Sequence, residues 1–147
     1  MKKSIWKIFL LPAFVVFAPL SVWAQNSETN VVNVTQLKTK WPENGSGAIR
    51  DSLVAIYNDM VVKKNEFILS HREYAHYYTG NSKDYFIIEE YKDLASMEKA
   101  ADRSSELEKQ AWPDKEKSKA FFDAMGAYFE DWHGDGLYRT NPKLSKN

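Results

Sequence analysis

The stretch from residue 66 to residue 91 alternates between apolar and polar residues in the manner of a β-hairpin. Two runs rich in aromatic and β-branched residues flank the turn-forming segment GNSKD at residues 80–84. Because successive residues of a strand face opposite sides, Ile87 and Ile88 lie on different faces, and both faces carry apolar residues. The pattern therefore predicts a sheet covered on both faces, by helices on one and by a second copy of the chain on the other.

Upstream of the hairpin, the pattern predicts one strand and one amphipathic helix. Residues 31–39 are dominated by β-branched residues, and Trp41-Pro42 with the loop at 43–47 ends this strand. A helix over residues 47–63, capped by Ser46, is predicted by apolar residues at helical spacing, which are Ile49, Leu53, Ile56, Tyr57 and Met60. Four polar residues fall on the other side of this helix: Arg50, Asp51, Asn58 and Asp59.

Downstream of the hairpin, two more helices and a short strand are predicted. Asp93 starts a second helix, which the polar segment 102–106 is expected to loosen. A third helix begins at Pro113 or Asp114 and continues to Trp132. It is predicted by the aromatic-rich stripe Phe121, Phe122, Met125, Tyr128, Phe129 and Trp132. Residues 133–136 then end the helix, residues 137–140 form a short strand, and residues 141–147 form a tail.

The first 24 residues have the layout of a secretory signal peptide. Lys2, Lys3 and Lys7 precede an apolar run at residues 8–20, and Ala24 offers a small residue for cleavage before Gln25. The alternative is an uncleaved membrane anchor, but the run is shorter than the roughly 20 residues of a spanning helix, and two prolines interrupt it. The sequence therefore predicts a periplasmic or secreted protein with no membrane segment after cleavage. Residues 25–30 are expected to be a disordered lead.

Composition restricts the chemistry of the mature chain. Residues 31–140 are enough for one domain and too few for two. Removing three signal-peptide lysines leaves 17 Lys and Arg against 20 Asp and Glu, so nothing favours binding to nucleic acid. With no cysteine in the chain, disulfides, thiol catalysis and thiolate metal sites are excluded.

The predicted order of elements, βαββα(α)β, is the plan of a ferredoxin-like α+β fold with an antiparallel sheet. Together with the segment YFIIEEYKDLASMEKA at residues 85–100, it resembles the dimeric α/β-barrel superfamily, which includes antibiotic-biosynthesis-monooxygenase-like and NIPSNAP-like domains. It also resembles uncharacterised exported bacterial proteins of this shape. The resemblance implies a homodimer whose two sheets enclose a barrel, where relatives hold their ligands.

The resemblance also implies positions for an oxygenase site. Superfamily members that oxidise quinones or degrade haem use an asparagine on the first strand, a tryptophan near the hairpin and, for haem, a histidine on the helix. Asn33 occupies the first position, but residues 66–91 contain no tryptophan and the second predicted helix contains no histidine. A polar residue at an edge or lumen position accounts for Asn33 better than an oxygenase site does.

The remaining polar and aromatic residues do not define a catalytic or metal site. His71 and His76 differ by an odd number of positions, so on a regular strand they face opposite sides and do not share a metal. No cofactor or metal is therefore predicted. Aromatic rings with polar tips suit a ligand pocket or a protein interface. The candidates for lining a pocket for a small apolar or aromatic ligand are Asn33, His71, His76, Tyr74, Tyr77 and Tyr85.

Two classes of function remain open at this stage. The first is a non-catalytic binding or structural homodimer. The second is a small-molecule enzyme of the monooxygenase-like kind with its site in the barrel lumen. A buried pocket lined by the candidate residues would favour the second class, and faces filled by side chains and a partner subunit would favour the first.

Overall fold

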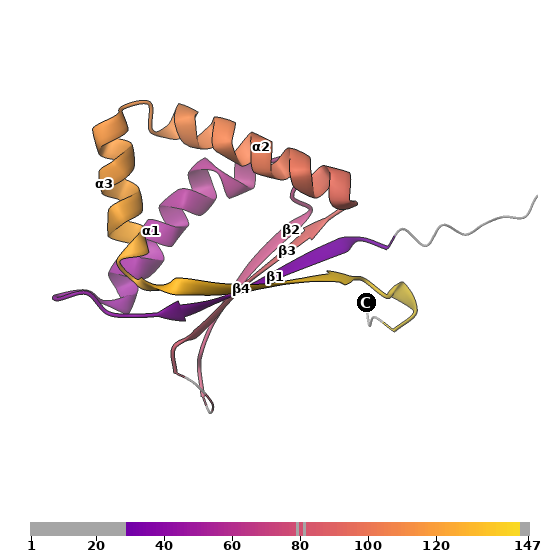
Figure 1. Ribbon diagram of the computed structural model, residues 1–147, viewed down its shortest axis with the longest axis horizontal. Helices are drawn as coiled ribbons and strands as arrows, with labels where there is room; N and C mark the ends of the chain where they lie inside the picture. The colour runs from indigo at the N-terminus through magenta and orange to yellow at the C-terminus, as the bar shows by residue number, and fades with distance from the viewer. Residues whose placement is uncertain (1–28, 79, 81, 145–147) are drawn as a thin grey trace, which may run out of the picture.

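The computed structural model describes residues 29–78, 80 and 82–144. These residues form a four-stranded antiparallel sheet in the order β2-β3-β1-β4, with three α-helices on one side of it (Figure 1). This is the predicted ferredoxin-like α+β arrangement, with one helix added before the last strand. The predicted signal peptide at residues 1–24 lies outside the described ranges. Within those ranges, no helix is long and apolar enough to cross a membrane.

The sheet is organised around β1 (Val31–Thr39), which has the bounds predicted for the first strand. β1 pairs antiparallel with β3 (Asp84–Tyr91) on one side and with β4 (Phe129–Arg139) on the other. β3 also pairs with β2 (Ser70–Ala75), which completes the predicted hairpin. β2 is shorter than the pattern from residue 66 suggests, because the chain makes a turn before it.

The first helix, α1 (Gly47–Met60), begins where the sequence predicts. The Ser46 Oγ accepts a hydrogen bond from the backbone N–H of Ile49 at 3.3 Å, as expected of a cap. The predicted helix to residue 63 divides at Val61, whose φ of −120° and ψ of −65° interrupt the helix before a 3-10 turn at Val62–Lys64. Val61 is fully buried, so this break is fixed by packing.

The second helix, α2 (Leu94–Ala111), starts after its predicted cap, Asp93. It is one continuous helix, so the expectation that the polar segment 102–106 loosens it is wrong. The buried side chain of Asn65 donates hydrogen bonds to the Ala100 carbonyl at 2.8 Å and to the Ser104 Oγ at 2.9 Å. These contacts fix the middle of α2 to the turn before β2, which local helix propensity does not reveal.

The end of the chain differs most from the prediction. The third helix, α3 (Lys115–Gly126), is capped by Asp114, one of its two predicted first residues, but it ends six residues before Trp132. The short strand predicted at 137–140 is part of the long strand β4. The aromatic residues from 121 to 132 belong to two different elements: Phe121 and Phe122 lie on α3, and Phe129 and Trp132 lie on β4. Residues 129–139 form a strand because they pair with β1 along most of the length of β4, and such long-range contacts override local periodicity.

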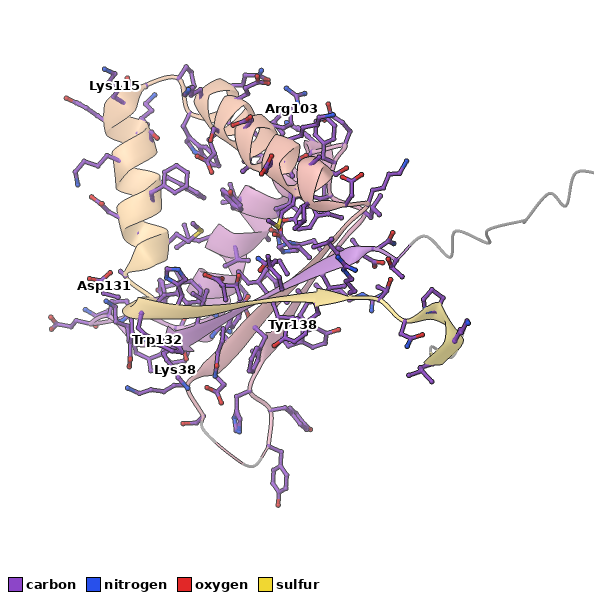
Figure 2. All side chains as sticks on the ribbon, turned by 45° about the vertical axis from the view of Figure 1, so that its right-hand side comes forward. Lys38, Arg103, Lys115, Asp131, Trp132 and Tyr138 are labelled. Carbon is purple, nitrogen blue, oxygen red and sulfur yellow. The ribbon has the colours of Figure 1, made fainter. Side chains whose placement is uncertain are left out.

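The strand registers divide the sheet into two unlike faces. The covered face, beneath the helices, carries mostly polar residues near its centre: Asn33, Thr35, His71, Glu73, Tyr85, Ile87, Glu89 and Tyr91. The open face, on the other side, carries an apolar and aromatic group: Val32, Val34, Tyr74, Phe86, Ile88, Trp132 and Tyr138. It also carries polar residues: Gln36, Lys38, Ser70, Arg72, Asp84 and Glu90. Figure 2 shows Trp132 and Tyr138 on the side away from the helices.

Candidate functional site

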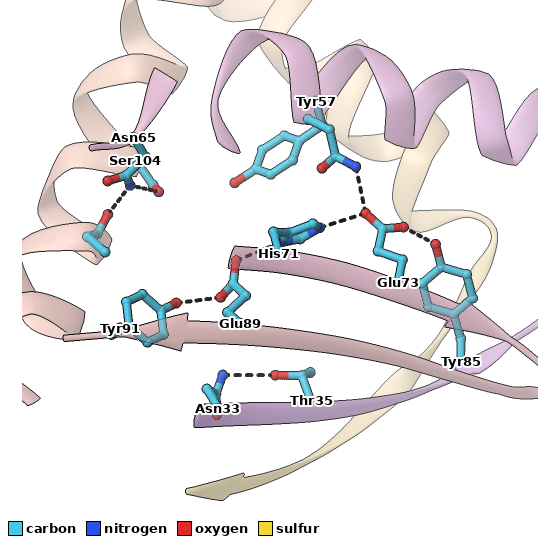
Figure 3. Close-up of polar contacts among 12 residues, drawn as sticks. Asn33, Thr35, Tyr57, Asn65, His71, Glu73, Tyr85, Glu89, Tyr91 and Ser104 are labelled. Carbon is cyan, nitrogen blue, oxygen red and sulfur yellow. Dashed lines mark hydrogen bonds and ion pairs between the residues drawn. The ribbon is translucent and has the colours of Figure 1, made fainter. Parts of the chain in front are cut away.

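The most strongly polar region of the covered face is a hydrogen-bonded group that we call the His71 cluster: His71, Glu73, Tyr85, Glu89 and Tyr91 (Figure 3). β2 supplies the first and second members, and β3 supplies the other three. Alternation along each strand puts all five on one face, and the register sets His71 directly opposite Glu89. Strand pairing alone therefore assembles this group.

His71 lies between two carboxylates. Its Nδ1 is 2.9 Å from the Glu89 Oε1, and its Nε2 is 2.9 Å from the Glu73 Oε1. Burial lowers the pKa of His71, but hydrogen bonds and charge attraction to Glu73 and Glu89 raise it further, to about 9. The imidazolium therefore donates from both nitrogens at neutral pH, and its proton is held too tightly for a general base.

The two carboxylates have further donors. The hydroxyl of Tyr85 donates to Glu73, and that of Tyr91 donates to the Glu89 Oε2 at 2.5 Å. Burial raises the pKa of both carboxyls, but the hydrogen bonds from His71 and from the tyrosines lower it below the ordinary value. Burial and the neighbouring carboxylates raise the pKa of both tyrosines, so the hydroxyls keep their protons.

Helix α1 closes the cluster from above. The Asn58 Nδ2 donates to the Glu73 Oε1 at 2.7 Å, so the residue predicted on the outer side of the helix faces the sheet. Ile49 and Ile56, from the predicted apolar stripe, are instead 48% and 46% exposed. The inner side of α1 is therefore mixed: Leu53, Tyr57 and Met60 of the stripe are half-buried, Asp51 and Asp59 are exposed, and Asn58 satisfies part of the polar sheet. The Asn58 Oδ1 is buried and has no hydrogen-bond partner among the described residues.

A hollow of about 320 Å3 lies between α1 and this part of the sheet. Its lining consists of Asp51, Val54, Ala55, Asn58, His71, Glu73 and Tyr85. Arg50, with only 11% of its side chain exposed, lies beside this region, 5.3 Å from the ring centre of Tyr85. The hollow is of the size that holds a small molecule, and its lining combines Glu73 and the phenol of Tyr85 from the sheet with Asp51 and the amide of Asn58 from α1.

The six pocket residues proposed from the sequence are only partly brought together. His71 and Tyr85 belong to the cluster. Asn33 is on the same face opposite Glu89 in the register, but its Nδ2 bonds to the Thr35 Oγ1 at 3.2 Å. The other three lie elsewhere: Tyr74 is on the open face, while His76 and Tyr77 follow the end of β2, with Tyr77 98% exposed.

The sequence reasoning missed Asn58, Glu73 and Tyr91, and it did not place Glu89 in a site. The signal that could have found the two acidic residues is their spacing, because His71-x-Glu73 and Glu89-x-Tyr91 each put two polar residues on one face of a strand. Among the described residues, no group of three or more His, Cys, Asp or Glu side chains is arranged so that it could hold a metal ion.

The raised pKa of His71 predicts how stability depends on pH. The folded pKa of about 9 lies above the ordinary 6.5, so the stabilisation is complete below about pH 6.5 and is lost as the pH rises through 9. The pKa values of Glu73 and Glu89 are lowered from 4.5, so their contribution is lost as the pH falls below that value. We expect maximal stability between these limits, with a loss of about 2 kcal/mol on the alkaline side, allowing for solvent screening.

Urea unfolding at a series of pH values, at constant protein concentration, measures this dependence. The variant His71→Gln should lose most of the decline between pH 6.5 and 9, whereas His76→Gln should keep it. An unchanged alkaline decline in His71→Gln would show that His71 does not cause it.

Comparisons with known proteins identify the fold. No protein-family model matches the chain, and no curated protein matches it significantly. A solved structure of a variant of SnoaB, a cofactor-independent oxygenase from Streptomyces nogalater, is similar with a TM-score of 0.50 and 14% identity, over 80% of this chain and 98% of that chain. A NIPSNAP family protein of unknown function from Agrobacterium tumefaciens has a TM-score of 0.49 and 13% identity, over 78% and 90%.

A Caulobacter crescentus protein, assigned by its name to the antibiotic biosynthesis monooxygenases, has a TM-score of 0.48 and 14% identity, over 76% of this chain and 89% of that chain. At such identities the likeness concerns the fold and not the chemistry. The chain therefore has a ferredoxin-like fold that is similar to the fold of SnoaB.

Proposed function

We propose that this chain is an exported homodimeric binding protein, and that its ligand occupies the hollow between α1 and the His71 cluster. The observation that carries the proposal is the concentration of charged and polar groups at a place where a sheet normally buries apolar side chains. Burying such groups costs free energy even when they are paired. A core serving stability alone is better filled with apolar residues, so we assign the polar lining to ligand recognition.

The lining also indicates the kind of ligand. The hydrogen-bond donors of His71 and the hydroxyl of Tyr85 are already used within the cluster. Asp51 also lines the hollow, and its Oδ1 accepts from Arg50 at 2.8 and 2.9 Å, which leaves its Oδ2 as a further acceptor. The hollow therefore favours a small polar molecule that brings its own hydrogen-bond donors. This differs from the apolar or aromatic ligand that the tyrosines suggested.

The proposed dimer rests on the open face. Tyr74, Trp132 and Tyr138 are 47%, 49% and 58% exposed there, and together with the neighbouring valines and isoleucine they form an apolar surface across the sheet. Glycines let the rings lie flat: a Cβ at Gly136 would come within 2.7 Å of Tyr138. A two-fold pairing of two such faces would remove this surface from water and form the barrel implied by the resemblance.

Native mass spectrometry of protein purified from its own host tests the binding site. Ala55 is exposed and lines the hollow, so Ala55→Trp should fill it and abolish a co-purifying small molecule. Ala48→Trp, also at an exposed position of α1 but outside the lining, is the matched control and should retain the small molecule. A bound mass unaffected by Ala55→Trp would place the ligand elsewhere, and no bound mass in either protein would argue against the proposal.

The same spectra test export. We propose that the signal peptide is removed between Ala24 and Gln25, since a charged segment and an apolar run precede a small residue there. The subunit recovered from outside the cytoplasm should therefore have the mass of a chain that begins at Gln25. A subunit of full length, recovered only with membranes, would contradict soluble export.

A second candidate function is an oxygenase. It is favoured by the fold shared with SnoaB and by Asn33, which lies on the covered face of β1 opposite Glu89. Oxygen uptake measured with a hydroquinone substrate distinguishes the two functions. Turnover that is lost in Asn33→Ala and retained in Asn44→Ala, a change in the surface loop before α1, would support the oxygenase.

A further inference from the structure

A second concave surface, separate from the hollow beneath α1, lies in the corner between the end of α2 and the start of α3. We call it the α2–α3 groove, and its volume is about 620 Å3. The lining residues of each helix recur at intervals of three or four, so each helix contributes one face. Trp112, Pro113 and Phe122 supply apolar surface, and Lys109, Lys115 and Lys119 supply positive charge.

The apolar surface of the groove is held in place by stacked rings. The ring of Trp112 stacks on Phe121 with centroids 4.3 Å apart and on Tyr57 with centroids 6.5 Å apart. Tyr57 is fixed in turn, because its hydroxyl donates to the Glu108 Oε1 at 2.9 Å. A ligand that covers Trp112 therefore meets an aromatic surface that is already ordered, which lowers the entropic cost of binding.

The charges around the groove are not balanced by its own acidic residues. Lys119 is paired with Asp123, and the Glu108 carboxylate accepts a hydrogen bond from Tyr57. Lys109 and Lys115 have no ion pair within the described part of the chain. Figure 2 shows Lys115 at the beginning of α3, at the top of this corner. An anionic group near these two ammonium groups would gain charge attraction without displacing an existing partner.

We propose that the α2–α3 groove binds an amphipathic carboxylate, with its anionic head at Lys109 and Lys115 and its apolar body on Trp112 and Phe122. This site goes beyond the binding function proposed for the hollow and does not depend on it. The volume lies within the range of small-molecule sites, about 300–1,000 Å3. A medium-chain fatty acid and an aromatic carboxylate share the required chemistry.

Isothermal titration of the mature dimeric protein with decanoate and with 2-naphthoate tests the proposal and distinguishes the two sources. Decylammonium has the same aliphatic body with the opposite charge, and it should bind at least about tenfold more weakly than decanoate. Lys115→Glu should weaken carboxylate binding by about three- to tenfold. A negative charge in the first turn of α3 suits the helix dipole, so this variant should remain folded.

Lys117→Glu is the matched control, because it makes the same charge change in the same helical turn outside the groove lining. It should leave both affinities within about twofold of the original. Three results would each overturn the proposal: no heat of binding with either carboxylate, equal affinity for decylammonium, or equal losses in the Lys115→Glu and Lys117→Glu variants. If the protein bound only to vesicles of anionic phospholipid, and saturably, the groove would be a membrane-binding surface and not a site for a free carboxylate.

Discussion

Replacing His71 by alanine is expected to destabilise the folded protein by about 3 kcal/mol at pH 6, because it leaves two partly buried carboxylates without the cation between them. His71 is 2.9 Å from both Glu73 and Glu89, and only 14% of its side chain is exposed. The tyrosine hydroxyls remain as donors after the change, but they carry no charge. The free energy of unfolding in urea measures the effect.

A second change in the same variant separates charge from packing. Adding Glu89→Gln to His71→Ala removes one of the two like charges and should recover part of the lost stability. His76→Ala, beyond the end of β2, is the control and should cost well under 1 kcal/mol. If His71→Ala were no more destabilising than His76→Ala, the charged cluster would not stabilise the fold.

The variant Ile88→Asp should dissociate the dimer while leaving each subunit folded. Ile88 is on the open face, in register with Val34 of β1 and Arg72 of β2, where a second copy is proposed to pack. An aspartate there would have to be buried in the apolar interface without a partner. We expect the dimer to dissociate at least about 100-fold more readily, which corresponds to about 3 kcal/mol.

Ile87→Asp should behave differently, because Ile87 lies on the covered face. It should reduce the stability of the subunit itself. Ile56→Asp, at a 46% exposed apolar position of α1, is the control for adding a charge outside the proposed interface. Light scattering coupled to size exclusion, together with circular dichroism, distinguishes the three variants. A monomeric unaltered protein at high concentration would contradict the dimer, and an intact Ile88→Asp dimer would move the interface elsewhere.

The first strand and the starts of the helices could be predicted from the sequence, because residue type and capping within a few positions determine them. β1 has its predicted bounds, Ser46 and Asp93 cap helices where helix starts were predicted, and Asp114, one of two predicted starts of the third helix, caps α3. The end of α3 and the length of β4 were not predictable in this way. Residues 129–139 form a strand because β1 offers them a partner 90 to 108 positions earlier in the chain. Periodicity within a short window contains no information about that pairing.

The candidate site shows a similar division. His71 and Tyr85 were predicted as pocket residues, and the structure places both on the covered face. The contact between His71 and Glu89 depends on the register of β2 against β3, which the hairpin loop sets and which a shift by one residue would destroy. The inward position of Asn58 was also not predictable, because the sequence pattern places it on the side of α1 away from the apolar stripe. Its hydrogen bond to Glu73 depends on the polar residues of the covered face.

The contacts of His71 with Glu73 and Glu89 make the covered face a polar site and not an apolar core. Nitrogen-detected NMR of the imidazole rings across a pH series tests these contacts directly. The chain has three histidines, so spectra of His76→Gln and His133→Gln assign the signals. If His71 lies between the two carboxylates, we expect it to keep protons on both ring nitrogens at pH 7.5 and to titrate near pH 9. A single ring proton at pH 7.5, with titration near the ordinary 6.5, would contradict it.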